Sequence, residues 1–366
     1  MANKRRILAG VLFDDSPVSS PIGIARLAAN SPLLEAKSRV QYFEIETRGV
    51  LNRTKPGMPF RWTINPYRGC EFGCKYCYAR YTHEFMGIES PALFEERIYA
   101  KSGLVPLLRA ELRKLDPADP VAIGTATDPY QPAERRFRRT RSILEVFAAG
   151  RGRRLSITTK SDLVTRDIDL LRAISAANSL NVNITITTLD PALARLLEPR
   201  APRPDLRLKA VSLLASAGVR VGVFPNPILP LITDSERRLD RLAAAARLHG
   251  ACYFGGGLLF LMPSARRVFF PFLAEKFPHL LDRYQQRYMR DAYLRGEYVE
   301  MVRTRVREIR ARYGLENGPT EHMPEGVEEP AQAALFESLT AGWRSSTLSS
   351  CSAPPAPAST HHTPLS

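Results

Sequence analysis

Apolar and β-branched runs alternate with amphipathic stretches through the middle of this 366-residue chain, with a period of roughly 30 residues. The runs predicted as strands are 61–66, 121–127, 154–159, 181–188, 220–225 and 251–261. The stretches predicted as helices are 103–115, 140–149, 166–177, 205–218 and 234–250. Successive strand–helix units favour parallel strands, so we expect an α/β fold that forms a partial (β/α)6 barrel, similar to part of a TIM barrel.

The segments on either side of these units have a different composition. Residues 1–56 lack clear periodicity, apart from one run that could form a short strand, and are predicted to be an N-terminal extension. Residues 57–264 form the predicted barrel core, and the charged segment 265–316 is predicted to be a helical C-terminal extension. The tail 317–366 is rich in Ser, Pro and Ala, and we expect it to be largely disordered.

Three of the five cysteines lie close together, at Cys70, Cys74 and Cys77, in the loop that follows the first predicted strand. In parallel α/β folds, ligands bind at the carboxyl ends of the strands, so this loop lies where chemistry is expected. Three thiolates can bind three irons of a [4Fe–4S] cluster, which is normally held by four cysteines. The fourth iron would then lack a protein ligand, and an open position on a metal usually binds a substrate or a cofactor.

Zinc is the main alternative for this loop. Cys70, Cys74, Cys77 and His83 could form a tetrahedral site of three cysteines and one histidine, in a protein that binds nucleic acid without redox chemistry. Zinc ligands more often occur as separated pairs, which favours the iron–sulfur interpretation. Structural disulfides are disfavoured because the cysteine count is odd and the N-terminus lacks a convincing signal peptide, so a reducing compartment is expected.

The formal net charge is +15, and a basic balance of this size permits binding to DNA or RNA. Several arginines lie together in the segment 134–141. A solvated helix face, or a genome-wide preference for arginine, explains the same composition. No apolar run approaches the length needed to span a bilayer, so we expect a soluble, cytoplasmic protein with no membrane partner.

Polar residues follow several predicted strands, at what should be one rim of the barrel. Thr127 and Asp128 follow the second strand, Lys160 follows the third, and Thr187 lies at the end of the fourth. Lys160 could pair with a carboxylate, Asp128 could accept from an ammonium group, and the two threonines could meet ribose or carboxylate oxygens. Such residues also cap the helices that follow strands, so both roles stay open.

The spacing C-x3-C-x2-C, with Tyr76 just before the last cysteine, resembles the signature of radical S-adenosylmethionine (SAM) enzymes. The segments INPYRGCEFGCKYCYAR, GTATDPYQPAERRFRRTRSILEV and SITTKSDLVTRDIDLL are similar to those of the spore-photoproduct-lyase-like branch of that superfamily. Members of this branch are often described as DNA repair photolyases. The resemblance extends over about residues 45–315.

The resemblance implies a barrel of the radical SAM type and a [4Fe–4S] cluster whose open iron binds SAM. One electron would cleave SAM to methionine and a 5′-deoxyadenosyl radical, which abstracts hydrogen from an unidentified substrate, with DNA or RNA as candidates. A reducing electron donor such as flavodoxin or ferredoxin is implied as a partner. Tyr76 would contact the adenine of SAM, and Lys160 and the segment with Thr127 and Asp128 would lie along SAM.

The chain departs from the lyases at one informative position. The lyases carry a hydrogen-donating cysteine in the stretch that matches GTATD, where this chain has Thr125, Ala126 and Thr127. A hydroxyl hydrogen is far harder to abstract than a thiol hydrogen. The sequence therefore argues against thymine-dimer reversal by the mechanism of the lyases, and it identifies no catalytic residue.

Four other residues near these segments have weaker predicted roles. Tyr130 could relay a radical or simply pack as an aromatic ring. His83 could hydrogen-bond near the cysteine sulfurs or lie on a helix surface. Glu198 and Arg200 are predicted to form an ion pair at the rim, without a part in catalysis.

Overall fold

The computed structural model describes residues 22–37, 39–316, 318–319 and 323–324, so the predictions for 1–21 and 325–366 lie outside the described residues. Its largest sheet has seven strands in the order β11-β10-β9-β8-β7-β4-β3. The strands from β4 to β11 run parallel, and β3 pairs with β4 in the antiparallel direction. The bounds are β3 Asn52–Arg53, β4 Trp62–Ile64, β7 Val121–Ile123, β8 Arg154–Thr159, β9 Ser179–Thr185, β10 Val221–Phe224 and β11 Tyr253–Phe254.

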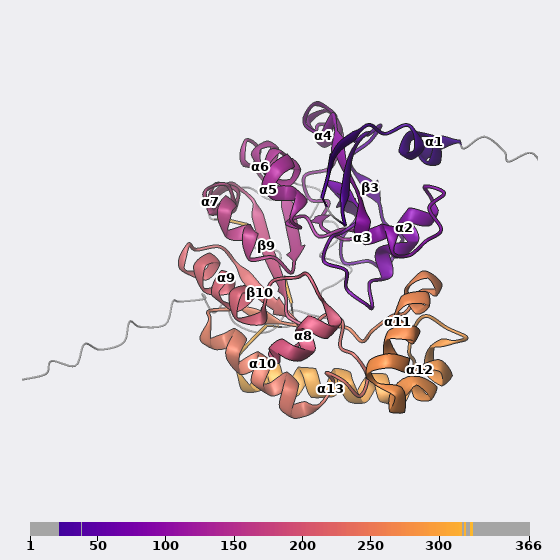
Figure 1. Cartoon of the computed structure of the whole chain (residues 1–366). Helices are drawn as coiled ribbons and strands as arrows, with labels where there is room; N and C mark the ends of the chain where they lie inside the picture. The colour runs from indigo at the N-terminus through magenta and orange to yellow at the C-terminus, as the bar shows by residue number, and fades with distance from the viewer. Residues whose placement is uncertain (1–21, 38, 317, 320–322, 325–366) are drawn as a thin grey trace, which may run out of the picture.

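Helices follow these strands in chain order around the outside of the sheet (Figure 1). They confirm the predicted partial (β/α)6 barrel and its alternation of strands and helices, although most of the strands are shorter than predicted. The helix bounds are α4 Leu104–Leu112, α5 Ala133–Phe137, α6 Arg139–Ala148, α7 Ile168–Ala177, α8 Pro191–Leu197, α9 Pro204–Ser216 and α10 Glu236–Leu248, with the 3₁₀ helix η2 at Asp162–Asp167. Apolar residues from the strands and from these helices form the main core between the two layers.

Buried polar side chains join neighbouring strands of this sheet. Asn183 of β9 donates to Ser156 Oγ (2.9 Å) and Thr158 Oγ1 (3.0 Å) of β8. The Tyr253 hydroxyl of β11 donates to Asn183 Oδ1 (2.7 Å), and its ring lies against Gly222 of β10, where a Cβ atom would clash with it. The side chains of Asn183 and Tyr253 therefore have partners for their buried polar groups.

A second sheet of four strands lies beside the barrel, in the order β1-β2-β6-β5, and β2 and β6 run parallel. Its bounds are β1 Leu33–Ala36, β2 Gln41–Glu46, β5 Tyr67–Arg68 and β6 Arg97–Ser102, and the short helices nearby are α1 Gly23–Ala29, η1 Tyr78–Arg80, α2 Tyr81–Glu84 and α3 Leu93–Glu96. The sequence indicated only one short strand here, and it did not indicate the sheet. Segments on both sides of residue 56 contribute to this sheet, so the sheet does not mark a boundary between the N-terminal extension and the barrel core. The domain limits stay a prediction.

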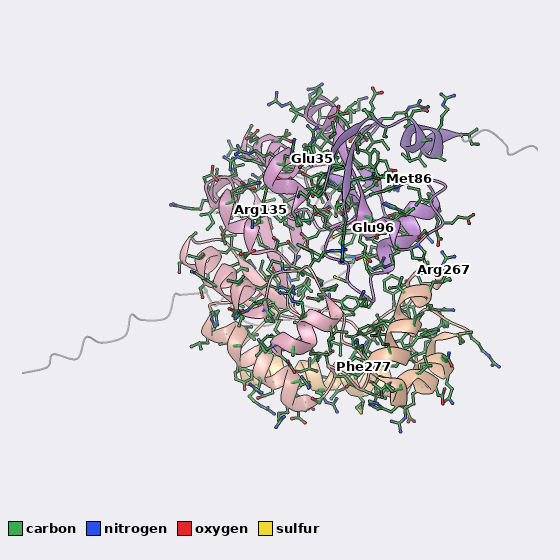
Figure 2. The ribbon with its side chains drawn as sticks, viewed as in Figure 1. Glu35, Met86, Glu96, Arg135, Arg267 and Phe277 are labelled. Carbon is green, nitrogen blue, oxygen red and sulfur yellow. The ribbon has the colours of Figure 1, made fainter. Side chains whose placement is uncertain are left out.

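The C-terminal extension is helical, as predicted. It contains α11 Pro263–Lys276, η3 Pro278–Leu280, α12 Leu281–Tyr288 and α13 Glu297–Arg312. Helix α13 lies beside α10, and Arg267 of α11 forms an ion pair with Glu84 of α2 (Figures 1 and 2). Within the described part of the chain, no helix combines the length and the apolar character that crossing a membrane requires.

Candidate functional site

The three cysteines lie between β5 and η1, beyond the carboxyl end of β4. Cys70 and Cys74 are buried, Cys77 is half-buried, and none of the three is in a disulfide. Burial raises the pKa of each thiol, because the surrounding cluster of apolar side chains disfavours a thiolate. A positively charged metal would reverse this effect, so three free thiols in one enclosed loop fit a soft metal centre.

The ligands of the zinc alternative do not converge on one point in this structure, although Nδ1 of His83 is buried without a partner. Among the described residues, no set of three His, Cys, Asp or Glu side chains is arranged to hold a metal ion. His83, the fourth ligand of that alternative, places Nε2 at 3.1 Å from the carbonyl oxygen of Arg97, and its ring lies against Phe94 and Tyr99. An iron–sulfur cubane binds each thiolate to a different iron, so its cysteines need not converge on one point.

Two arginines and one glutamate hold the backbone of the cysteine loop. Arg80 Nη2 donates to the carbonyl oxygen of Cys74 (3.1 Å), and Arg200 Nε donates to the carbonyl oxygen of Glu71. Glu95 forms an ion pair with each of the two arginines. The predicted pair of Arg200 with Glu198 is therefore wrong, because the guanidinium of Arg200 binds Glu95 and the loop instead.

Gly73 lies directly beside the ion pair of Glu95 with Arg200. Its φ of +64° is one that side chains other than glycine rarely adopt, and a Cβ atom there would clash with Glu95 Oε2 and with Arg200 Nη2. Glycine thus lets the loop pass closely beneath the ion pair. The position of the cysteines depends on segments that lie more than a hundred residues further along the chain, as the bond from Arg200 to Glu71 shows.

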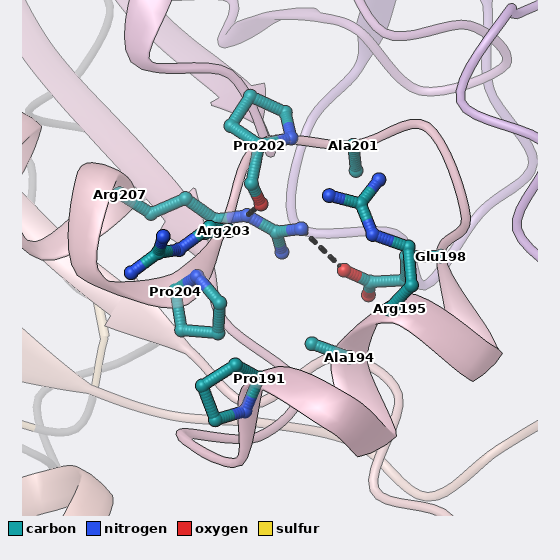
Figure 3. A pocket seen from close by; sticks show the side chains of 9 residues that line it. All are labelled: Pro191, Ala194, Arg195, Glu198, Ala201, Pro202, Arg203, Pro204 and Arg207. Carbon is teal, nitrogen blue, oxygen red and sulfur yellow. Dashed lines mark hydrogen bonds and ion pairs between the residues drawn. The ribbon is translucent and has the colours of Figure 1, made fainter.

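Glu198 is the partner of three predicted cofactor-binding residues. It follows α8 and is 2% exposed. Tyr76 donates its hydroxyl to Glu198 Oε1, Thr187 Oγ1 donates to the same oxygen (2.7 Å), and Lys160 Nζ lies 3.6 Å from it. Arg207 of α9 forms an ion pair with Oε2 at 2.5 Å (Figure 3). Burial raises the pKa of Glu198, but the charges of Arg207 and Lys160 outweigh it and lower the pKa to about 2.

The structure therefore brings Tyr76, Lys160 and Thr187 together. The ammonium of Lys160 lies 5.7 Å from the centre of the Tyr76 ring, and it donates to the carbonyl oxygen of Asn226 (3.2 Å). Thr187 Oγ1 lies 3.2 Å from the same carbonyl oxygen. The end of α8, which carries Glu198, lies beside the cysteine loop, since the backbone N–H of Lys75 donates to the carbonyl oxygen of Leu197 (2.9 Å). The charge of Glu198 accordingly contributes to the raised pKa of Cys74.

Thr127 and Asp128 lie beside the same loop but bind protein groups. Thr127 Oγ1 donates to the carbonyl oxygen of Gly69 (2.6 Å), one residue before Cys70. Asp128 accepts from Thr159 Oγ1 (2.6 Å) and from the backbone N–H of Lys160 (2.7 Å). Thr127 thus connects the segment after β7 to the cysteine loop, and Asp128 connects it to the end of β8. Their contact with a cofactor stays a prediction.

The sequence did not indicate two further features of this site. The first is Arg207, which is 1% exposed. In the sequence, the only sign of its burial is that this charged residue lies next to Leu208, on the apolar side of a predicted helix. The ring of Tyr78, next to Cys77, lies 4.7 Å from that of Phe260, which stacks on Tyr293 at 5.1 Å. Phe260 therefore links Tyr78, beside the cysteine loop, to Tyr293 of the C-terminal extension.

Comparison with protein families gives a match to the radical SAM superfamily over residues 64–243. A Mycobacterium tuberculosis protein described as uncharacterized is 35% identical over 337 residues, which cover 89% of this chain and 97% of the relative. A Methanocaldococcus jannaschii protein, also described as uncharacterized, is 30% identical over 66% of this chain and 85% of the relative.

Two solved structures of spore photoproduct lyase variants share the fold. One has a TM-score of 0.60 at 17% identity and covers 82% of this chain and 86% of the lyase. The other holds AdoMet and a dinucleoside spore photoproduct, with a TM-score of 0.55 at 16% identity over 74% of this chain and 80% of the lyase. At these identities the comparison establishes the fold.

Proposed function

Since this chain belongs to the radical SAM superfamily, we propose that it is an enzyme whose [4Fe–4S] cluster is held by Cys70, Cys74 and Cys77. When bound, the cluster supplies the electron that cleaves SAM to methionine and a 5′-deoxyadenosyl radical. The observation that carries the proposal is the set of three free thiols in one enclosed loop at the carboxyl end of a parallel strand. Three cysteine ligands leave one iron available to SAM.

The residues around the loop have separate roles in this proposal. Lys160 would offer a cation to the carboxylate of SAM, and Tyr76 would contact the adenine beside the cysteine loop. Thr187 offers a hydroxyl to the ribose. Thr127 holds the segment after β7 to the cysteine loop, and Asp128 holds it to the end of β8, so that polar groups would face SAM from a rigid rim.

The substrate is unidentified, and DNA or RNA is the candidate that we favour. The lyase with the same fold binds a dinucleoside photoproduct, and the charge of +15 suits a phosphate-rich partner. Residues 125–127 lack a cysteine, which argues against thymine-dimer reversal by the mechanism of the lyases. A different lyase-like or nucleic-acid-modifying reaction is therefore the form of the proposal that we favour. A cytoplasmic electron donor such as flavodoxin or ferredoxin would complete the system.

Anaerobic reconstitution tests the proposal. Protein treated with iron and sulfide should be brown, contain about four irons per chain, and release 5′-deoxyadenosine from SAM after reduction with dithionite. Cys74→Ala should lose both the iron and the product. Lys75→Ala is the control, because it changes a residue of the same loop without removing a thiol, and it should keep both the iron and the product.

Two results would contradict the proposal. Equal amounts of 5′-deoxyadenosine from wild type and Cys74→Ala would show that the loop has no part in the reaction. A colourless protein with one zinc per chain would instead support the non-redox, nucleic-acid-binding alternative.

A further inference from the structure

The two oxygens of the Glu198 carboxylate have different partners. Oε1 faces Tyr76, Thr187 and Lys160, and Oε2 faces the guanidinium of Arg207 (Figure 3). Both Glu198 and Arg207 are almost fully buried. A buried charge needs a partner, so neither side chain can leave without a large cost in free energy.

Arg207 is itself held in place from α9. Its Nε donates to the carbonyl oxygen of Pro202 (2.8 Å), and Nη1 donates to the carbonyl oxygen of Thr185 (3.0 Å) at the end of β9. The guanidinium therefore has a fixed direction, and its ion pair fixes the orientation of the Glu198 carboxylate. Glu198 in turn offers Oε1 to the rim at a defined position.

The carboxylate of Glu198 in turn restrains the side chain of Lys160. Its ammonium has three hydrogens, and the protein provides the carbonyl oxygen of Asn226 (3.2 Å) and the carboxylate of Glu198 (3.6 Å) as its neighbours. The Lys160 side chain is 15% exposed, so it keeps some access from the rim. A free lysine has a flexible four-carbon stem, which an ion pair at its end restrains.

We propose that Glu198 is a positioning residue, which holds Lys160 and Tyr76 where they receive the carboxylate and the adenine of SAM. The inference rests on the proposed function, because it takes SAM as the ligand. The sequence predicted only an ion pair of Glu198 with Arg200, so the positioning of Lys160 and Tyr76 is a new role for this residue. In the alternative, Glu198 only joins α8 to α9 through Arg207.

The first test replaces the charge of Glu198. Glu198→Gln keeps the size of the side chain and an acceptor for Tyr76 and Thr187, but it removes the anion that restrains Lys160. Because this variant leaves Arg207 buried without a partner, the double variant Glu198→Gln/Arg207→Gln removes both charges and preserves their balance. Both variants should bind SAM about tenfold more weakly than wild type.

A buried glutamate elsewhere in the chain supplies the control. Glu134 is 0% exposed, accepts the hydroxyl of Tyr67 (2.5 Å) and pairs with Arg166 (2.7 Å). It repeats the tyrosine–glutamate–arginine set of Glu198, but its carboxylate binds Tyr67, Arg166 and the backbone N–H groups of Thr140 and Arg141. Glu134→Gln should lose stability and keep the SAM affinity of wild type.

A double-mutant cycle then asks whether Glu198 acts through Lys160. Lys160→Gln should weaken SAM binding, and adding Glu198→Gln to it should change the dissociation constant by less than about twofold. The readouts are equilibrium binding of labelled SAM to reconstituted, reduced protein and the change that SAM causes in the electron paramagnetic resonance spectrum of the cluster. Thermal unfolding of each variant reports its stability separately.

The outcomes separate the inference from the function on which it rests. Weaker SAM binding in both Glu198 variants, with little added effect over Lys160→Gln, supports the positioning role. Wild-type affinity in the double variant, or independent additive losses from Glu198→Gln and Lys160→Gln, overturns it while leaving the proposed function intact. Absence of SAM binding by wild type with its full complement of iron overturns both.

Discussion

At the residue scale, His83 is an imidazole enclosed by aromatic rings. It is 1% exposed, its ring lies 5.1 Å from that of Phe94 and 6.0 Å from that of Tyr99, and Nε2 lies near the carbonyl oxygen of Arg97. Burial, together with nearby guanidinium charges, lowers the pKa of His83 to about 4. The folded protein therefore holds this imidazole neutral at pH values where the unfolded chain would protonate it.

His83 should make the stability of the protein depend on pH. Between the ordinary pKa of 6.5 and the folded pKa of about 4, the unfolded state binds more protons, so the free energy of unfolding falls as the pH falls. His83→Phe removes this contribution. Relative to wild type, the variant should gain about 3 kcal/mol of stability between pH 7 and pH 4, measured by chemical denaturation. A difference that stays constant over this range would contradict the assignment.

At the element scale, α13 supplies part of the main core. Val302, Val306 and Ile309 are buried on one face of the helix, and they join the apolar side chains of the barrel strands and of α10. Polar contacts support the same arrangement, since Tyr298 donates its hydroxyl to Asp234. The amphipathic pattern of α13 therefore stabilises the barrel from outside its strand–helix units.

Shortening a buried side chain of α13 should destabilise the whole barrel. Ile309 is 1% exposed, so Ile309→Ala should lower the free energy of unfolding by about 2–4 kcal/mol, measured as a shift of the urea midpoint. Met301, on the same helix, is 44% exposed, and Met301→Ala should change the free energy by less than about 1 kcal/mol. Equal losses from the two variants would show that α13 does not dock as described.

At the scale of the whole molecule, ion pairs reduce the number of arginines available to a partner. Arg136 pairs with Glu35, Arg139 with Glu44, and Arg141 with Asp167 and Asp169. Arg135 and Arg138 of the same segment are exposed. The basic run 134–141, which was a candidate for contact with nucleic acid, therefore includes arginines that join α5 and α6 to neighbouring elements.

This distribution limits how far the basic run can contribute to binding nucleic acid. Arg135→Gln together with Arg138→Asn should reduce the slope of log K against log salt, for a non-specific single-stranded oligonucleotide, by at most about 2. Arg139→Gln should lower stability and leave the slope unchanged, because its partner is Glu44. A loss of four or five units of slope on replacing the exposed pair would contradict this account.

Much of the barrel could be predicted because its signals are local. Strand β9 and helix α10 each carry their own burial pattern, and consecutive strands of a parallel sheet tend to become neighbours. The sequence indicated one short strand of the second sheet but not its partners, since β6 pairs with β2 from the distant N-terminal segment. Which distant strand pairs with it depends on the packing of the whole chain.

The position and spacing of Cys70, Cys74 and Cys77 were settled by the sequence alone, because three cysteines in one loop remain neighbours in any fold. So was the order of the barrel units, because burial periodicity repeats within each unit. Only the tertiary structure paired Glu198 with Arg207 and brought Tyr76 to it across 122 residues. A charged side chain can find many partners in the sequence, and the cost of burying it unpaired selects among them only once the chain has folded.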